Sequence, residues 1–89
     1  MDVRIDPELA ILYGGKIVEF ASSYNKEIAN IYSIVDYIKK EWTWKAAQRF
    51  TDDIDSYRNE YQEFGKLIAN FGELLNSIGK DYQALEEDL

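Results

Sequence analysis

Apolar residues recur along two long stretches of the chain at alternating steps of three and four positions. In the first stretch the series comprises Ile17, Ala21, Tyr24, Ile28, Ile31, Val35, Ile38 and Trp42. In the second it comprises Ala47, Phe50, Ile54, Tyr57, Tyr61, Phe64, Ile68, Phe71, Leu75, Ile78, Tyr82, Leu85 and Leu89. This is the spacing of the a and d positions of a heptad, whereas a strand would alternate every second residue. The pattern therefore predicts an all-α fold with two long helices.

Local signals indicate where these helices begin and end. Asp6 is suited to cap the first backbone amides, and Pro7 is preset for the first helical position. We expect a first helix over about 7–40, a turn over about 41–45, a second helix over about 46–85 and an acidic C-terminal tail. Because a turn this short joins antiparallel neighbours, the chain is predicted to form one helical-hairpin domain, residues 1–89.

The first helix carries more apolar side chains than one neighbouring helix can cover. The surplus lies at its e and g positions, beside the a and d stripe. These residues are Ile11, Tyr13, Val18, Phe20, Tyr32 and Ile34. Because a two-helix contact needs only the a and d stripe, we expect this second face to bind a partner chain. The hairpin is therefore predicted to pair into a four-helix bundle dimer.

Three glycines of the second helix, Gly65, Gly72 and Gly79, are spaced by seven residues and share the e position. Each costs about 1 kcal/mol relative to alanine inside a helix, so three in register require a reason. They can form a packing groove that lets residues 13–24 of the first helix approach the backbone. They can also form a docking groove for another protein. We favour the packing interpretation.

Composition narrows the possible functions. The 89 residues include 17 acidic and 10 basic side chains, giving a net charge of −7, and neither cysteine nor histidine. This charge argues against binding to nucleic acid or to anionic membranes. No stretch approaches the roughly 20 apolar residues of a membrane span, so we expect no membrane insertion. The N-terminus lacks a basic region followed by an apolar one, so we expect no signal peptide.

The sequence offers no catalytic constellation. Asp52, Asp53 and Asp55 are clustered, but they lack the glycine and the distal glutamate of a calcium loop. Acidic residues are favourable near a helix N-terminus, which accounts for them without a ligand. There is also no phosphate-binding glycine loop and no nucleophile beside a base. We therefore expect no metal, no cofactor and no enzyme activity.

The predicted turn carries a resemblance to a known family. Residues 42–50, Trp-Thr-Trp-Lys-Ala-Ala-Gln-Arg-Phe, resemble the hairpin signature of the WXG family, the small ESAT-like proteins of type VII secretion. That signature is Trp-x-Gly, then small residues and an aromatic eight positions after the tryptophan. Trp42, Ala46, Ala47 and Phe50 fit it, whereas Trp44 stands where the family has glycine. This difference alters the turn, because glycine allows a tighter turn than tryptophan.

A second family feature lies near the C-terminus. Tyr82 and Glu86 match a Tyr-x-x-x-Asp/Glu element, and residues four apart share one face of a helix. In the family this element is an export signal that acts beside the turn of a dimer partner. It should project beyond the first helix, whose Asp6 cap is expected opposite Leu85. Tyr82 also continues the a series, so its alternative role is in the core.

The resemblance implies a small secreted protein or escort of a type VII secretion system, cytoplasmic before export. Such a protein acts by protein–protein interaction, as a homodimer or as a heterodimer with a related small helical protein, and is recognised by the membrane ATPase of the secretion system. A narrower version is a dedicated partner for the helical N-terminal region of a larger toxin. The residues alone leave open an intracellular structural or adaptor bundle with no export role.

Overall fold

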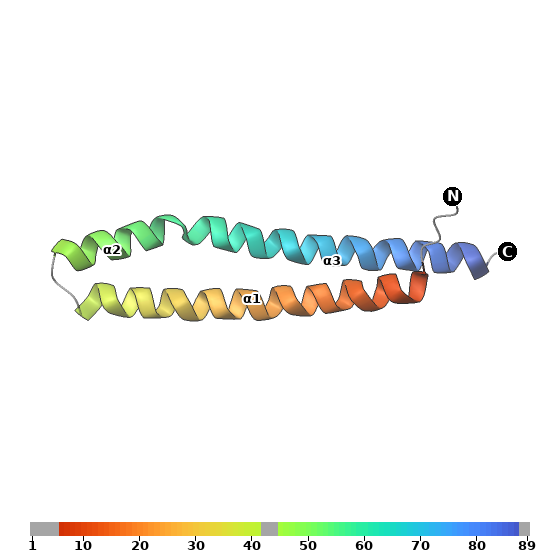
Figure 1. Ribbon diagram of the computed structural model, residues 1–89, viewed down its shortest axis with the longest axis horizontal. Coiled ribbons are helices and arrows are strands. Elements are labelled where there is room, and N and C mark those ends of the chain that lie inside the picture. The colour runs from red at the N-terminus through yellow and green to blue at the C-terminus, as the bar shows by residue number, and fades with distance from the viewer. Residues whose placement is uncertain (1–5, 42–44, 88–89) are drawn as a thin grey trace.

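The protein is an antiparallel helical hairpin. The computed structural model describes residues 6–41 and 45–87, without the side chains of Ala46 and Ala47. Its elements are α1 (Pro7–Glu41), α2 (Lys45–Ser56) and α3 (Arg58–Glu87). α1 forms one arm, and α2 with α3 forms the other (Figure 1). The all-α hairpin predicted from the heptad spacing is confirmed.

The N-terminus of α1 is capped as its sequence predicts. Oδ1 of Asp6 accepts hydrogen bonds from the backbone amides of Glu8 and Leu9, at 3.0 and 3.2 Å. These amides have no partner within the helix, so the aspartate satisfies them. The Asp6 carbonyl then accepts the first backbone bond, from Ala10 at 3.0 Å. The cap fixes where the long arm begins.

The two arms pack through small residues. Ala10, Gly14 and Ala21 of α1 are buried, and so are Gly65, Gly72 and Gly79 of α3. A Cβ atom built on Gly72 would lie 2.8 Å from the carbonyl oxygen of Gly14, and one on Gly79 would lie 2.8 Å from that of Pro7. These backbones are too close for any side chain between them. The glycine stripe therefore forms the centre of the hairpin contact.

This contact differs from the predicted seam of the second arm. The aromatic and leucine residues at its d positions are about half exposed or more instead of lying between the helices. They are Phe50, Tyr57, Phe64, Phe71 and Leu85, with exposed fractions between 51% and 61%. Large rings would hold helices 8–10 Å apart, whereas the glycines permit a closer approach. The contact consequently centres on the e stripe, and the rings turn to one side.

The second arm is interrupted at Tyr57, which corrects the predicted unbroken helix 46–85. The amide of Tyr57 donates to the carbonyl of Ile54 at 3.2 Å, a tighter bond than an α-helix makes. The hydroxyl of Tyr32 donates to the same carbonyl at 2.9 Å. Ser56 Oγ also donates back to the carbonyl of Asp53 at 2.6 Å, a bond that bends helices. α2 and α3 are offset at this point (Figure 1).

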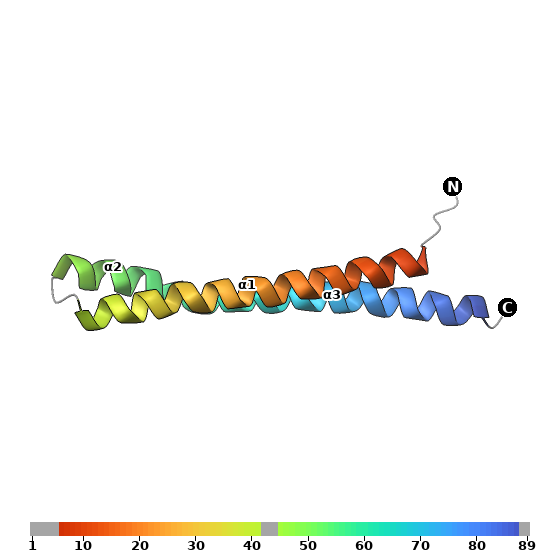
Figure 2. The same cartoon turned by 90° about the horizontal axis from the view of Figure 1, so that it is seen from below.

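The hairpin is long and thin. Its principal extents are 68 × 22 × 15 Å and its radius of gyration is 20.0 Å, against about 12 Å for a compact domain of this length. The two arms cross at a small angle, and α3 continues past the start of α1 (Figure 2). The accessible surface is 7339 Å², roughly a third above the about 5400 Å² of a compact monomer of 10.4 kDa. One layer of two arms leaves much apolar surface uncovered.

Candidate interaction surface

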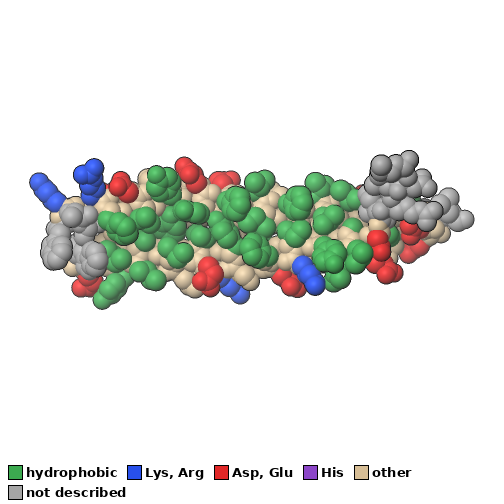
Figure 3. All heavy atoms as spheres, viewed as in Figure 1, with side chains coloured by type: hydrophobic (Ala, Val, Ile, Leu, Met, Phe, Trp, Pro, Cys, Tyr) green, Lys and Arg blue, Asp and Glu red, His purple; other side chains and the backbone are tan. Residues whose placement is uncertain are grey.

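A continuous apolar face runs along one side of the hairpin. Hydrophobic side chains of both arms cover this side, with charged groups along its edges (Figure 3). We call it the apolar face, and each of its members is between 48% and 62% exposed. The members are Tyr13, Phe20, Ile31 and Ile34 of α1, Phe50 of α2, Tyr57 at the interruption, and Tyr61, Phe64, Leu67, Phe71, Leu74 and Leu85 of α3.

Helix geometry explains why both arms contribute to the same side. In α1 the members of the apolar face occupy the d and g stripes, on one flank of the contact made by Gly14 and Ala21. In the second arm they occupy the a, d and g stripes, on the matching flank of the glycine stripe. Because the arms run antiparallel, the matching flanks face the same way. Monomers rarely expose contiguous apolar patches beyond a few hundred Å², so a face of this length indicates an interaction surface.

Aromatic contacts give the middle of the apolar face a fixed shape. The rings of Tyr24 and Phe64 meet edge to face, with centroids 5.7 Å apart and planes at 65°. The hydroxyl of Tyr24 donates to the carbonyl of Tyr61 at 3.2 Å. With Tyr57 and Glu60 these side chains line a shallow groove. The middle of the apolar face is therefore held in place by contacts between α1 and α3.

The predicted dimer face divides into two groups in the structure. Tyr13, Phe20 and Ile34, at g positions, lie on the apolar face. The e-position residues instead belong to the hairpin contact, which corrects the prediction for all three of them. Ile11 approaches Gly79, Val18 approaches Gly72, and Tyr32 is only 5% exposed. The reason is the glycine stripe, which draws the contact toward the e side of α1.

The three glycines lie within the hairpin contact and not on an open groove. Gly72 and Gly79 are opposite Gly14 and Pro7, and Gly65 is opposite Tyr24 and Asn25. Nearby, the side-chain amide of Asn76 donates to the carbonyl of Ile11 at 3.2 Å.

The residues that sequence reasoning assigned to the core, above all Phe64 and Phe71, are the ones that face outward. The seven-residue spacing of the glycines could have indicated this orientation, because only the e stripe lets the helices approach closely.

A polar cluster on the other side of the hairpin holds the interrupted arm to α1. Arg58 Nη2 donates to Asp36 Oδ1 at 3.0 Å and to the carbonyl of Tyr32 at 3.3 Å, and its guanidinium lies 4.5 Å from the centre of the Tyr32 ring. Lys39 Nζ lies 2.9 Å from Asp55 Oδ2, and Arg58 Nε lies 3.5 Å from Asp55 Oδ1. This cluster ties both sides of the interruption to one helix.

Two groups of this cluster have shifted acidities. The hydrogen bond from Lys39 holds the pKa of the Asp55 carboxyl below its ordinary value of 3.8, with the charge of Arg58 acting in the same direction. Burial raises the pKa of the Tyr32 hydroxyl above its ordinary value of 10.0. Both shifts follow from contacts that join the two arms, so the cluster has a structural role.

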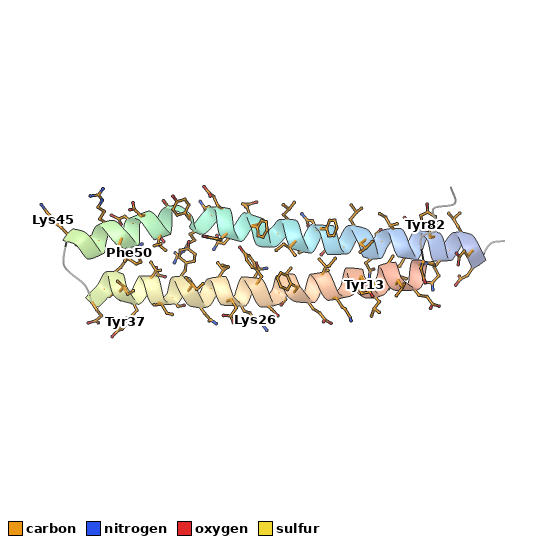
Figure 4. The ribbon with its side chains drawn as sticks, in the orientation of Figure 1. Tyr13, Lys26, Tyr37, Lys45, Phe50 and Tyr82 are labelled. Carbon is orange, nitrogen blue, oxygen red and sulfur yellow. The ribbon has the colours of Figure 1, made fainter. Side chains whose placement is uncertain are left out.

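Of the two family features in the sequence, the C-terminal element lies within the described residues and most of the turn motif does not. Trp42 and Trp44 lie outside the described residues, as do the side chains of Ala46 and Ala47. Tyr82 of α3 is 43% exposed (Figure 4). Glu86 of the same helix is also exposed. The start of α1 lies opposite Gly79 and not opposite Leu85 as counted from the sequence. The last eight residues of α3, about 12 Å of helix, therefore follow the point where α1 begins.

Within residues 6–41 and 45–87, no group of three or more acidic side chains is arranged to hold a metal ion. The described helices also include none that is long and apolar enough to cross a membrane. Comparison with protein-family models, with curated proteins and with solved structures finds no match for this chain.

Proposed function

We propose that this chain is a small secreted protein or escort of a type VII secretion system, acting as a helical hairpin that pairs with another helical chain. The apolar face is the observation that carries the pairing. The hairpin contact uses glycines and alanines, so rings such as Phe20, Phe64 and Phe71 stay available to a partner. Burying them against another hairpin would complete a four-helix bundle. The helical N-terminal region of a larger toxin is one partner of this kind.

The export assignment rests on the resemblance of Tyr82 and Glu86 to the family signal. It is supported by their position, since both are exposed on one face of α3 beyond the start of α1. A ring and a carboxylate in this place lie past the start of α1, where a membrane ATPase can contact them. Export would then use the end of α3, and pairing would use mainly the apolar face on α1 and, on the second arm, from Phe50 to Leu74.

Export from intact cells tests this proposal. Tyr82→Ala and Glu86→Ala should each abolish appearance of the protein in the culture medium, with helicity and melting temperature nearly unchanged. Tyr37→Ala and Glu87→Ala serve as matched controls, because Tyr37 is exposed near the other end of the hairpin and Glu87 is exposed next to Glu86. Both controls should be exported normally.

Normal export of Tyr82→Ala and Glu86→Ala would contradict the assignment of the element. If the unaltered chain stays inside cells that secrete other type VII proteins, the intracellular adaptor function replaces the secreted one. A large loss of stability in Tyr82→Ala would instead place this tyrosine in the core. Each outcome can be read from the medium, the cell pellet and a thermal melt.

A further inference from the structure

The g positions of the hairpin carry charge of one sign only. They lie in line with Tyr13 and Phe20 on α1 and with Leu67 and Leu74 on α3, at the outer edges of the apolar face. Within the described helices, every charged residue at a g position is acidic and exposed. These residues are Glu27, Glu41, Asp53, Glu60 and Asp81. We call them the acidic rim.

The acidic rim is placed to face a partner. In coiled coils the e and g residues flank the apolar contact and determine which chains pair. Here the e stripe is used inside the hairpin, where Gly65, Gly72 and Gly79 are buried against α1. The g stripe alone therefore remains at the edge of the apolar face. Whatever covers this face brings its own flanking residues against the acidic rim.

A second copy of this chain would bring acids against acids. Two copies can place their apolar faces together with α1 over α1 or with α1 over the other arm. Both arrangements set g stripes opposite g stripes, and the only charges that these stripes carry are negative. Like charges at such an interface oppose pairing.

No g position of the described helices carries a basic residue. Lys39 and Arg58 are paired with Asp55 and Asp36 on the other side of the hairpin. Lys66 lies 3.2 Å from Glu63 of its own helix. The other basic residues of the described helices lie at c and f positions and not in the g stripe. A partner with basic flanking residues would therefore supply the charges that this stripe lacks.

We propose that the partner of this chain is a different helical chain, whose apolar stripe is flanked by lysine and arginine, and that the acidic rim disfavours a second copy. This rests on the proposed pairing through the apolar face and names the chemistry of the partner. The excess surface is sufficient, because a standard interface buries about 800 Å² per chain. Opposite charges across the rim would also speed association and fix its orientation.

A charge-reversed copy of this chain provides a defined partner for the test. The variant E27K/E60K/D81K keeps the apolar face and changes only the rim. Equal amounts of the unaltered chain and this variant are mixed at low ionic strength, and the dimers are counted by native mass spectrometry. The mixed dimer should exceed the statistical 1:2:1 distribution on the order of tenfold. In 1 M salt the preference should largely disappear.

The matched control is E19K/D52K/E73K. It makes the same number and type of charge changes at exposed f positions, which lie away from the apolar face. Mixing this variant with the unaltered chain should give nearly statistical dimers. Circular dichroism on all three proteins checks that each remains helical.

The outcomes separate the two proposals. Statistical mixing of E27K/E60K/D81K with the unaltered chain would overturn the inference about the partner but leave pairing intact. The inference about the partner would also be overturned if the unaltered chain forms a tight homodimer at low salt and E27K/E60K/D81K forms one of equal affinity. Absence of every dimer, in low and in high salt, would overturn pairing through the apolar face itself.

Discussion

The backbones of Gly14 and Gly72 touch: a Cβ atom on Gly72 would lie 2.8 Å from the Gly14 carbonyl oxygen, and one on Gly14 would lie 2.7 Å from the Gly72 carbonyl oxygen. This single crossing sets how close the arms approach. It also explains why the large side chains are outside the contact, since helices this close leave room only for small residues. The position of the apolar face follows from these two glycines.

Replacing Gly72 with alanine should therefore destabilise the hairpin. The new methyl group would meet a backbone carbonyl and the Cγ2 atoms of Ile17 and Val18 at 2.9 Å, so the helices would have to move apart. We expect the free energy of unfolding in urea to fall by about 1–3 kcal/mol, as for other overpacked contacts.

Gly15→Ala is the matched control for this substitution. A Cβ atom at Gly15 meets nothing within 4 Å, and both glycines lie inside long helices. Alanine there should raise the free energy of unfolding by up to about 1 kcal/mol through helix propensity alone. Equal effects of the two substitutions would contradict close packing at Gly72.

The hydroxyl of Tyr32 should matter for the joint between α2 and α3. Tyr32→Phe removes the hydrogen bond from its hydroxyl to the Ile54 carbonyl, which then keeps only the bond from the amide of Tyr57. The melting temperature should fall by a few degrees, and amides around Tyr57 should exchange faster with deuterium. Tyr37→Phe, an exposed tyrosine on the same helix, should change neither measurement. Unchanged hydrogen exchange of the amides around Tyr57 in Tyr32→Phe would show that the hydroxyl does not stabilise the interruption between α2 and α3.

Asp55 should make stability depend on pH in acid. The contact with Lys39 lowers its folded pKa below 3.8, so the folded state binds this proton less readily than the unfolded state. Its stabilisation is therefore present above pH 3.8 and is lost as pH falls through the folded pKa. Melting temperatures between pH 6 and pH 2 should fall less steeply for Asp55→Asn than for the unaltered chain. Asp52→Asn, at an exposed position, should keep the steep fall in melting temperature. If Asp55→Asn falls as steeply as the unaltered chain, the Lys39–Asp55 contact is not the cause of the pH dependence.

Much of the fold was predictable because it depends on local and repeating signals. Steps of three and four identify helices, Asp6-Pro7 marks the start of the first, and the short segment before Lys45 requires antiparallel arms. These features act through neighbours in sequence.

The orientation of the second arm was not predictable from periodicity. Heptad spacing shows which stripe is apolar, but not which part of that stripe contacts the other arm. The contacting stripe is set by Gly65, Gly72 and Gly79, because the lack of side chains there lets the helices approach closely. Phe64 and Phe71 stay exposed although they have more apolar area to bury. The interruption at Tyr57 also depends on Tyr32, which is distant in sequence. Only the folded hairpin brings these two regions together.

The central claim is that the apolar face, and not the glycine stripe, binds a partner chain. Sedimentation equilibrium in 1 M NaCl tests it most directly, because screening over about 3 Å removes the repulsion of the acidic rim. The unaltered chain should form a dimer, whereas Phe20→Glu and Ile34→Glu should each be monomeric. Leu12→Glu is the control and should still dimerise, because Leu12 is exposed at an f position away from the apolar face. A chain that stays monomeric at every concentration, or a dimer that persists in Phe20→Glu and Ile34→Glu, would contradict the claim.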